Sequence, residues 1–134
     1  MRSYTIGRAA RLLGVSPDTV RRWTDSGRLP TRRDDAGRRL IEGADLAAFA
    51  VALSQDSGQD DAEEDEPRTS VRNAFPGIVT AVTLGDVAAQ VEIQAGPHRL
   101  VSLVTREAVE ELGLAVGVEA VARVKATNVH IDTL

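Results

Sequence analysis

The sequence predicts an α+β protein of two small domains, a helical one followed by a strand-rich one, joined by an acidic segment. Three observations predict this class. Apolar residues recur at helical spacing near the N-terminus, and they alternate with polar residues in the C-terminal half. The balance of charge changes sharply along the chain. The length of 134 residues suits one ordinary domain or two small ones.

Charge divides the chain into three parts. Residues 1–53 hold ten arginines and six acidic residues, whereas residues 54–67 hold seven acidic residues and no basic one. Residues 68–134 are close to neutral, with six basic and seven acidic residues. Like charges repel, and residues 54–67 offer no large apolar side chain to bury. We therefore expect a disordered acidic linker at 54–67 between domains at 1–53 and 68–134.

The first domain begins with a pair of short helices. The first helix is indicated by apolar residues at helical spacing, namely Ile6, Ala9, Ala10 and Leu13. Gly14 ends this helix, and Ser16 followed by Pro17 is typical of the start of the next one. Trp23 shares the apolar face of the second helix with Val20, so we expect Trp23 to lie in the core.

Shorter elements follow the second helix. Residues 28–31 indicate a strand, residues 32–38 a hairpin tip, residues 39–41 the returning strand and residues 44–49 a closing helix. Two helices joined by a turn can place the second helix in the major groove of DNA. Arginine suits that position because it binds phosphate groups and guanine edges. The pattern predicts a winged helix-turn-helix, with a small helical protein-binding module as the alternative.

The segment TIGRAARLLGVSPDTVRRWTDSGRLPTRRDDAGRRLI resembles the MerR/excisionase type of winged helix-turn-helix domain. The resemblance covers about 50 residues. It implies base contacts from the second helix and contacts of the wing with the DNA backbone. The DNA-binding residues implied in this way are Ser16, Thr19, Arg21, Arg22, Arg38 and Arg39.

The second domain shows five apolar stretches suited to strands and one short helix. The expected strands are residues 79–84, 87–93, 98–104, 118–125 and 129–134. Thr105 can cap a helix over residues 106–112. Five short strands and one helix suggest a small OB-like β-barrel.

The blocks SVRNAFPGIVTAVTLGDVAAQVEI and LVSLVTREAVEELGLAVGVEAVARVKATNVHI are similar to the molybdate-binding Mop module of the TOBE group. The match runs over nearly all of residues 70–134. It implies one oxyanion site shared between subunits, with Ser70, Arg72, Thr105 and Lys125 as ligands. The family usually has serine at the position of Ala108, where this chain keeps only the backbone N–H.

Molybdate chemistry is consistent with these residue types, because a tetrahedral dianion needs donors and positive charge only. Tungstate has nearly the same shape. Each residue also has an ordinary structural role open to it. Arg72 can be a surface arginine, Lys125 a solvated strand end, Thr105 a simple helix cap and Ser70 part of the linker.

Together the two resemblances predict a molybdate-responsive DNA-binding transcriptional regulator, similar in logic to ModE-type regulators. Two alternatives stay open: a molbindin-type molybdate storage protein, and an excisionase-like architectural DNA binder whose barrel serves only to oligomerise. The resemblance implies a homo-oligomer, at least a dimer and by preference a hexamer.

Several functions are not expected. The absence of cysteine excludes disulfides, thiolate zinc sites and cysteine nucleophiles. No nucleophile–base pair or metal cluster is visible, so we expect neither an enzyme nor a metal site, and no organic cofactor. No apolar run reaches the length of about 18 residues that a membrane helix needs. The sequence thus indicates a cytoplasmic protein without a membrane partner.

Overall fold

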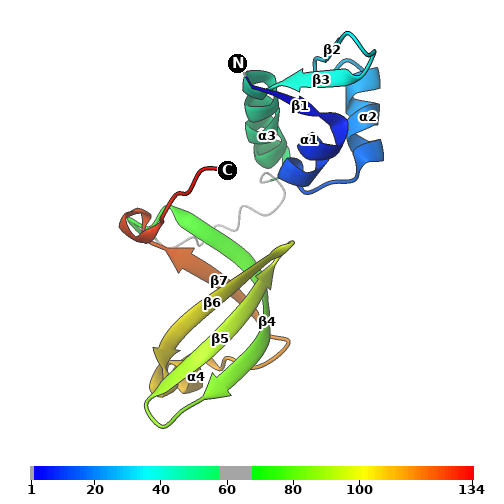
Figure 1. Cartoon of the computed structure of the whole chain (residues 1–134). Coiled ribbons are helices and arrows are strands. Elements are labelled where there is room, and N and C mark those ends of the chain that lie inside the picture. Colours follow the sequence, from blue (N-terminus) through cyan, green and yellow to red (C-terminus); the bar gives the residue numbers. More distant parts are fainter. Residues whose placement is uncertain (1, 58–67) are drawn as a thin grey trace. The chain divides into compact units, whose positions relative to one another are not determined.

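The computed structural model describes residues 2–57 and 68–134, which belong to two compact units, residues 1–66 and 67–134 (Figure 1). The described residues of the first unit form three helices and a small antiparallel sheet of strand order β1-β3-β2. Its elements in chain order are β1 (Ser3–Thr5), α1 (Ile6–Leu13), α2 (Pro17–Asp25), β2 (Arg32–Arg33), β3 (Arg39–Glu42) and α3 (Gly43–Ser57).

Local capping fixes the two helices of the helix-turn-helix. The Thr5 hydroxyl accepts the N–H of Arg8 at the start of α1, and Gly14 ends the helix with a φ of 71°. Ser16 caps α2 in the same way, and Pro17 occupies the first helical position. These features confirm the two predicted helices and the turn between them.

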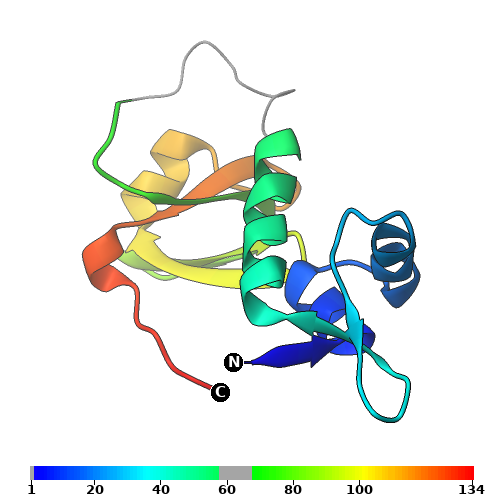
Figure 2. The same cartoon turned by 90° about the horizontal axis from the view of Figure 1, so that it is seen from above.

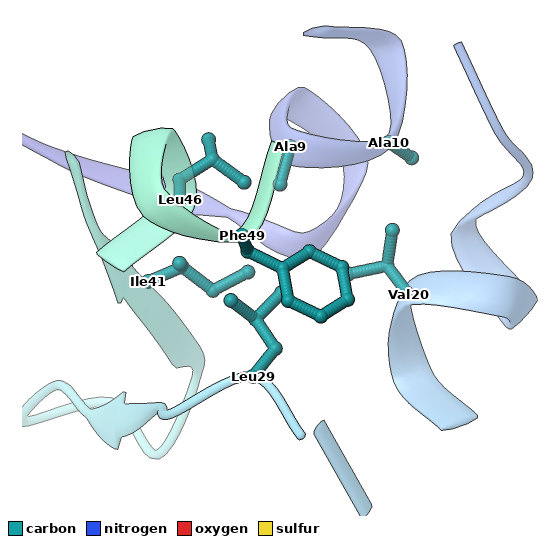
Figure 3. Packing of buried hydrophobic residues seen from close by; sticks show 7 residues of the cluster. All are labelled: Ala9, Ala10, Val20, Leu29, Ile41, Leu46 and Phe49. Atoms are coloured by element: carbon teal, nitrogen blue, oxygen red, sulfur yellow. The ribbon is translucent and has the colours of Figure 1, made fainter. Parts of the chain in front are cut away.

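One apolar cluster holds the first unit together. Figure 3 shows side chains from α1, α2, β3 and α3 meeting around Phe49. The Trp23 ring lies 5.0 Å from the Phe49 ring, and Trp23 packs against the cluster as predicted. The buried members of the cluster are Ala9, Ala10, Val20, Leu29, Ile41, Leu46 and Phe49.

The structure corrects the predicted wing and closing helix. The prediction of a strand at residues 28–31 is wrong, because these residues pair with no strand within residues 2–57: the Leu29 N–H donates to the Trp23 carbonyl oxygen at 3.1 Å, and the Leu29 side chain is buried. The strand that pairs with β3 is instead Arg32–Arg33. Helix α3 extends to Ser57, since Leu53 continues its apolar face against the core. Residues 54–57 of the predicted linker are therefore helical, and residues 58–67 lie outside the described residues.

The second unit is a curled antiparallel sheet of strand order β6-β5-β4-β7 with one short helix (Figures 1 and 2). Its elements are β4 (Asn73–Leu84), β5 (Ala88–Ala95), β6 (His98–Thr105), α4 (Arg106–Leu112), β7 (Glu119–Val124) and the 3-10 turn η1 (Ala126–Asn128). The buried core comprises Val79, Ala89, Val91, Ile93 and Val109. Val109 belongs to α4, so this helix packs on the sheet.

Strand β4 bends so that its two halves have different neighbours. Residues 73–78 pair with β7, whereas residues 78–84 pair with β5. A bulge lies between Val79 and Ala81, and bulges bend the strand that carries them. Gly77 lies just before it, where a Cβ atom would overlap the backbone carbonyl of Gln94. The absence of a side chain at Gly77 thus permits the close approach of β4 and β5.

The predicted fifth strand at residues 129–134 is wrong for this single chain. These residues follow η1 without strand pairing, and Ile131 and Leu134 are 88% and 96% exposed. A strand needs the edge of another strand to pair with. After β7 the chain turns through η1, and residues 129–134 pair with no strand among the described residues of the same chain. The first strand of the unit also starts earlier than predicted, at Asn73, because its beginning pairs with β7.

Among the described residues, no helix combines the length and the apolar character that crossing a bilayer requires.

Candidate functional sites

The hydroxyl groups at the start of α2 form hydrogen bonds within that helix. The Ser16 hydroxyl oxygen accepts the backbone N–H of Thr19 at 3.2 Å. The two hydroxyl oxygens of Ser16 and Thr19 lie 2.9 Å apart in a further hydrogen bond. Ser16 is exposed and Thr19 is half-buried. They therefore fix the helix start and still present polar atoms to solvent.

Arg21 and Arg22 lie on the exposed side of α2, opposite the fully buried Val20. Arg21 Nη1 pairs with Asp18 Oδ1 at 2.7 Å. Arg22 Nη2 donates to Thr19 Oγ1 at 3.3 Å, a long and weak contact. Both guanidinium groups remain accessible to a partner outside the helix.

The wing is organised around Asp34. Its carboxylate accepts the backbone N–H groups of Ala36 and Arg38 at 3.0 and 2.9 Å, and Arg38 Nε at 3.1 Å. The backbone hydrogen bond from Arg38 holds the pKa of Asp34 below its ordinary value, with desolvation opposing it. The Arg38 side chain is 72% exposed. The tip therefore has a defined shape and presents Arg38 outward.

Arg39 behaves differently from Arg38. Its side chain is 28% exposed, and its Nη1 atom contacts Asp25 Oδ1 at 2.7 Å. The same atom donates to Thr24 Oγ1 at 3.0 Å. Arg39 thus connects the wing to the C-terminal turn of α2, and its guanidinium is already engaged.

Four arginines surround a groove between α2 and the wing: Arg21, Arg33, Arg38 and Arg39. Arg33 was not among the predicted DNA-binding residues. Its Nη1 atom donates to the carbonyl oxygen of Gly37 at 2.7 Å, across the hairpin tip. Arg32, the neighbour of Arg33, instead binds Glu42 and Ser3 in the small sheet. The sequence alone could not show which of Arg32 and Arg33 faces the groove, because that depends on the register in which β2 pairs with β3.

The predicted oxyanion ligands of the second unit lie at both ends of its sheet. Asn73 pairs with Val124, and Asn73 Nδ2 donates to the Val124 carbonyl at 3.1 Å. Arg72 and Lys125, the residues next to this pair, therefore lie at the same end. Ser70 precedes them in the exposed segment before β4.

Thr105 lies at the opposite end. It pairs with Ala88, next to the hairpin that joins Leu84 to β5. The 12 residues of β4 separate the two ends by roughly 35 Å along the strand. Thr105 Oγ1 accepts the backbone N–H of Ala108 at 3.0 Å, which caps α4. One copy of the unit thus brings Arg72 and Lys125 to one end and holds Thr105 and Ala108 at the other.

Comparison with known proteins matches both units. The helix-turn-helix domain model matches residues 3–51, and the TOBE domain model matches residues 69–131. The molybdenum-pterin-binding protein MopA of Rhodobacter capsulatus is 34% identical over 97% of this chain. The transcriptional repressor DcmR of Methylorubrum extorquens is 46% identical over 52% of this chain.

The chain spans 60% of the length of MopA and 26% of the length of DcmR. It covers 93% of the molybdenum-pterin-binding protein 2 of Clostridium pasteurianum, at 40% identity over 46% of this chain. These matches confirm the predicted combination of a helix-turn-helix with a Mop/TOBE module. Through its TOBE domain, preceded here by a helix-turn-helix domain, the chain belongs to the molybdenum-pterin-binding protein family.

Proposed function

We propose that this protein is a DNA-binding transcriptional regulator that responds to molybdate or tungstate. One observation carries the proposal: a single chain joins a helix-turn-helix unit with an exposed arginine face to a TOBE unit of the molybdenum-pterin-binding family. Neither matched domain model describes an enzyme, and we assign the chain no catalytic step or organic cofactor. As a regulator of genes, it would act in the compartment that holds the DNA, which agrees with the expected cytoplasmic location.

The proposed DNA interface is the exposed side of α2 together with the wing. Arg21 and Arg22 would enter the major groove with Ser16 and Thr19, and Arg38 would contact the DNA backbone from the hairpin tip. Exposure of Arg21, Arg22 and Arg38 supports this assignment. The relation to the repressor DcmR supports a role in transcription.

The proposed ligand site uses Arg72 and Lys125 for positive charge and Ser70 for hydrogen bonds. Molybdate offers four acceptor oxygens and no donor, so such a set fits it. Thr105 would contribute the hydrogen of its hydroxyl group from another subunit, and the Ala108 N–H, which donates to Thr105 Oγ1, would have to share its hydrogen with the ligand. Their separation from Arg72 along β4 supports a site completed between copies, since one chain does not bring these groups together.

Assembly into at least a dimer, with a hexamer preferred, is part of the proposal. The outer strands β6 and β7 border a groove lined mainly by apolar residues of β5, β6 and β7. Leu103 on β6 is 77% exposed, and Ile131 in the C-terminal tail is 88% exposed. Apolar surface of this extent on outer strands is typical of a surface that another chain covers.

Two measurements on the full chain test the function. Isothermal titration with sodium molybdate should give heat of binding, and absence of both heat and thermal shift at millimolar ligand would refute the sensor. Selection of genomic fragments with the protein should recover a promoter. Molybdate binding without any recovered promoter would indicate a storage protein. DNA binding that is indifferent to molybdate would indicate an architectural DNA binder.

A further inference from the structure

The groove of the first unit that is lined by arginines also contains one acidic residue, although a negative charge does not suit a DNA-binding surface. Of the described residues that line the groove between α2 and the wing, Asp25 is the one carboxylate among Arg21, Arg33, Arg38 and Arg39. Asp25 is exposed. A carboxylate on a surface that faces phosphate groups weakens DNA binding by repulsion. Its presence there requires a compensating role.

Arg39 supplies the compensating contact. The Arg39 Nη1 atom lies 2.7 Å from Asp25 Oδ1 and donates to Thr24 Oγ1 at 3.0 Å. The Thr24 hydroxyl in turn donates to the Arg21 carbonyl oxygen at 2.8 Å. Arg39 is thus tied to the last turn of α2 through a carboxylate and through a hydroxyl that is itself fixed to the helix backbone.

Strand β3 is anchored by β1 at three positions, which end at Leu40, so few contacts fix the hairpin beyond Leu40. Strand β2 pairs with β3 at two positions only, Arg32 with Leu40 and Arg33 with Arg39. The chain between α2 and β2 is anchored by the buried Leu29. Because Arg33 lies opposite Arg39 in the register, a contact that holds Arg39 also holds Arg33 and the hairpin tip against α2.

Exposure separates Arg39 from its neighbour in the sequence. The Arg38 side chain is 72% exposed, whereas that of Arg39 is 28% exposed. Arg33 is exposed and donates across the tip to the Gly37 carbonyl oxygen, and it forms no ion pair with a carboxylate of the described residues. Arg38 also pairs with a carboxylate, that of Asp34, but through Nε at 3.1 Å and with most of its side chain exposed. The wing thus has two exposed arginines suited to phosphate, Arg33 and Arg38, and a third, Arg39, that is partly buried against Asp25.

We infer that Arg39 is a positioning residue that sets the wing against α2 through Asp25, and that Arg33 and Arg38 make the wing's contacts with DNA phosphates. This inference rests on the proposed DNA-binding function. It replaces the direct DNA contact that the family resemblance implies for Arg39. Asp25, an acidic residue, then favours DNA binding because it pre-orients the wing.

The test compares two acidic residues of α2 in the full chain. Asp25→Ala and Asp18→Ala remove the same charge from the same helix, but within residues 2–57 Asp18 pairs only with Arg21, on the surface. Binding is measured by fluorescence anisotropy on a short duplex recovered with the wild-type protein, over a series of salt concentrations. We expect Asp25→Ala to weaken binding on the order of tenfold, and Asp18→Ala to leave it equal or stronger.

Arg39 variants give the second arm. Arg39→Ala should weaken binding as much as Asp25→Ala, and the double variant should be no weaker than either. The slope of log affinity against log salt should stay unchanged in Arg39→Ala, whereas loss of a phosphate contact lowers the slope by about 0.9. Arg33→Ala should show that lower slope. The exchanged pair Asp25→Arg/Arg39→Asp should recover most of the affinity.

Three results would overturn the inference: tighter binding by Asp25→Ala, a lower salt slope in Arg39→Ala, or weaker binding by the exchanged pair than by either single variant. A second readout needs no DNA. Amide hydrogens of residues 32–42 should exchange faster in Asp25→Ala and Arg39→Ala but not in Asp18→Ala. If the wild-type protein recovers no duplex, the proposed function fails. Unchanged amide hydrogen exchange in Asp25→Ala and Arg39→Ala would refute the positioning role independently of that result.

Discussion

Asn73 Nδ2 donates a hydrogen bond to the Val124 carbonyl oxygen at 3.1 Å, joining the start of β4 to the end of β7. The two residues are also opposite each other in the strand register. Arg72 and Lys125 flank this pair, so two residues that are far apart in the sequence carry positive charge at one end of the sheet. This relationship gives the first prediction its physical basis.

Arg72→Ala and Lys125→Ala should each weaken molybdate binding about 10- to 150-fold, since each removes a charged hydrogen bond worth roughly 1.5–3 kcal/mol. Isothermal titration of the folded variants measures the change. Arg99→Ala is the matched control, because Arg99 pairs with Glu92 on the sheet surface. Wild-type affinity in a folded Arg72→Ala/Lys125→Ala protein would exclude the site.

A second prediction separates the two roles of Thr105. Its hydroxyl caps α4 through the Ala108 N–H, so Thr105→Ala should lower the free energy of unfolding by about 0.5–2 kcal/mol. Urea unfolding followed by circular dichroism measures this loss. Thr105→Ser keeps the hydroxyl and should retain both stability and molybdate affinity. If Thr105→Ala binds molybdate like the wild type, the hydroxyl serves the cap alone.

Features that depend on neighbouring residues could be predicted from the sequence, and features that depend on distant ones could not. Gly14, Ser16 and Thr105 all act on backbone groups within one helical turn, and each lies where its residue type indicated. Their helices were predicted for the same reason.

The failures concern long-range contacts. Residues 129–134 alternate like a strand, but a strand forms only on a partner edge, which composition does not supply. The contact of Arg39 with Asp25 joins the wing to a helix across an intervening turn, so sequence placed Arg39 only among the basic residues of the wing. Its engagement by a carboxylate became visible with the structure.

The third prediction concerns Arg22. The exposed guanidinium group makes one long contact, with Thr19, and is available to DNA. Arg22→Ala should weaken operator binding, because a contact of α2 in the major groove is lost. Molybdate affinity should not change. Arg99→Ala removes the same charge from the other unit and serves as the control. An unaltered affinity at every salt concentration would remove Arg22 from the interface.

A fourth prediction follows from the lowered pKa of Asp34. Because the folded pKa lies below the unfolded one, the stabilisation is present above the ordinary carboxyl pKa of about 4 and is lost as the pH falls through the folded value. Asp34→Asn should lower stability at neutral pH and flatten its dependence on acid. Asp35→Asn changes the neighbouring, exposed carboxylate and should do neither.

Fluorescence of the single tryptophan, Trp23, follows the unfolding of the first unit alone, because the other unit holds no tryptophan. Thermal unfolding of Asp34→Asn and Asp35→Asn across a pH series gives the comparison. Equal acid dependence in the two variants would show that the hydrogen bonds of Asp34 do not stabilise the wing.

The last prediction concerns assembly through the C-terminal tail. Ile131 and Leu134 are 88% and 96% exposed in one chain, and burial of each such side chain contributes about 1.5–3 kcal/mol. The outer strands β6 and β7 present unpaired backbone groups beside an apolar groove. A second copy of the chain can bury these apolar side chains and pair with these backbone groups. Light scattering of the full chain should therefore give the mass of a dimer or a larger oligomer. Removal of residues 129–134, or Ile131→Asp with Leu134→Asp, should shift it toward monomer and abolish molybdate binding, because Thr105 then no longer meets Arg72. Asp132→Asn should leave the assembly intact.

A monomeric full chain that still binds molybdate would refute the shared site, and an oligomer unaffected by the truncation would place the interface on another surface.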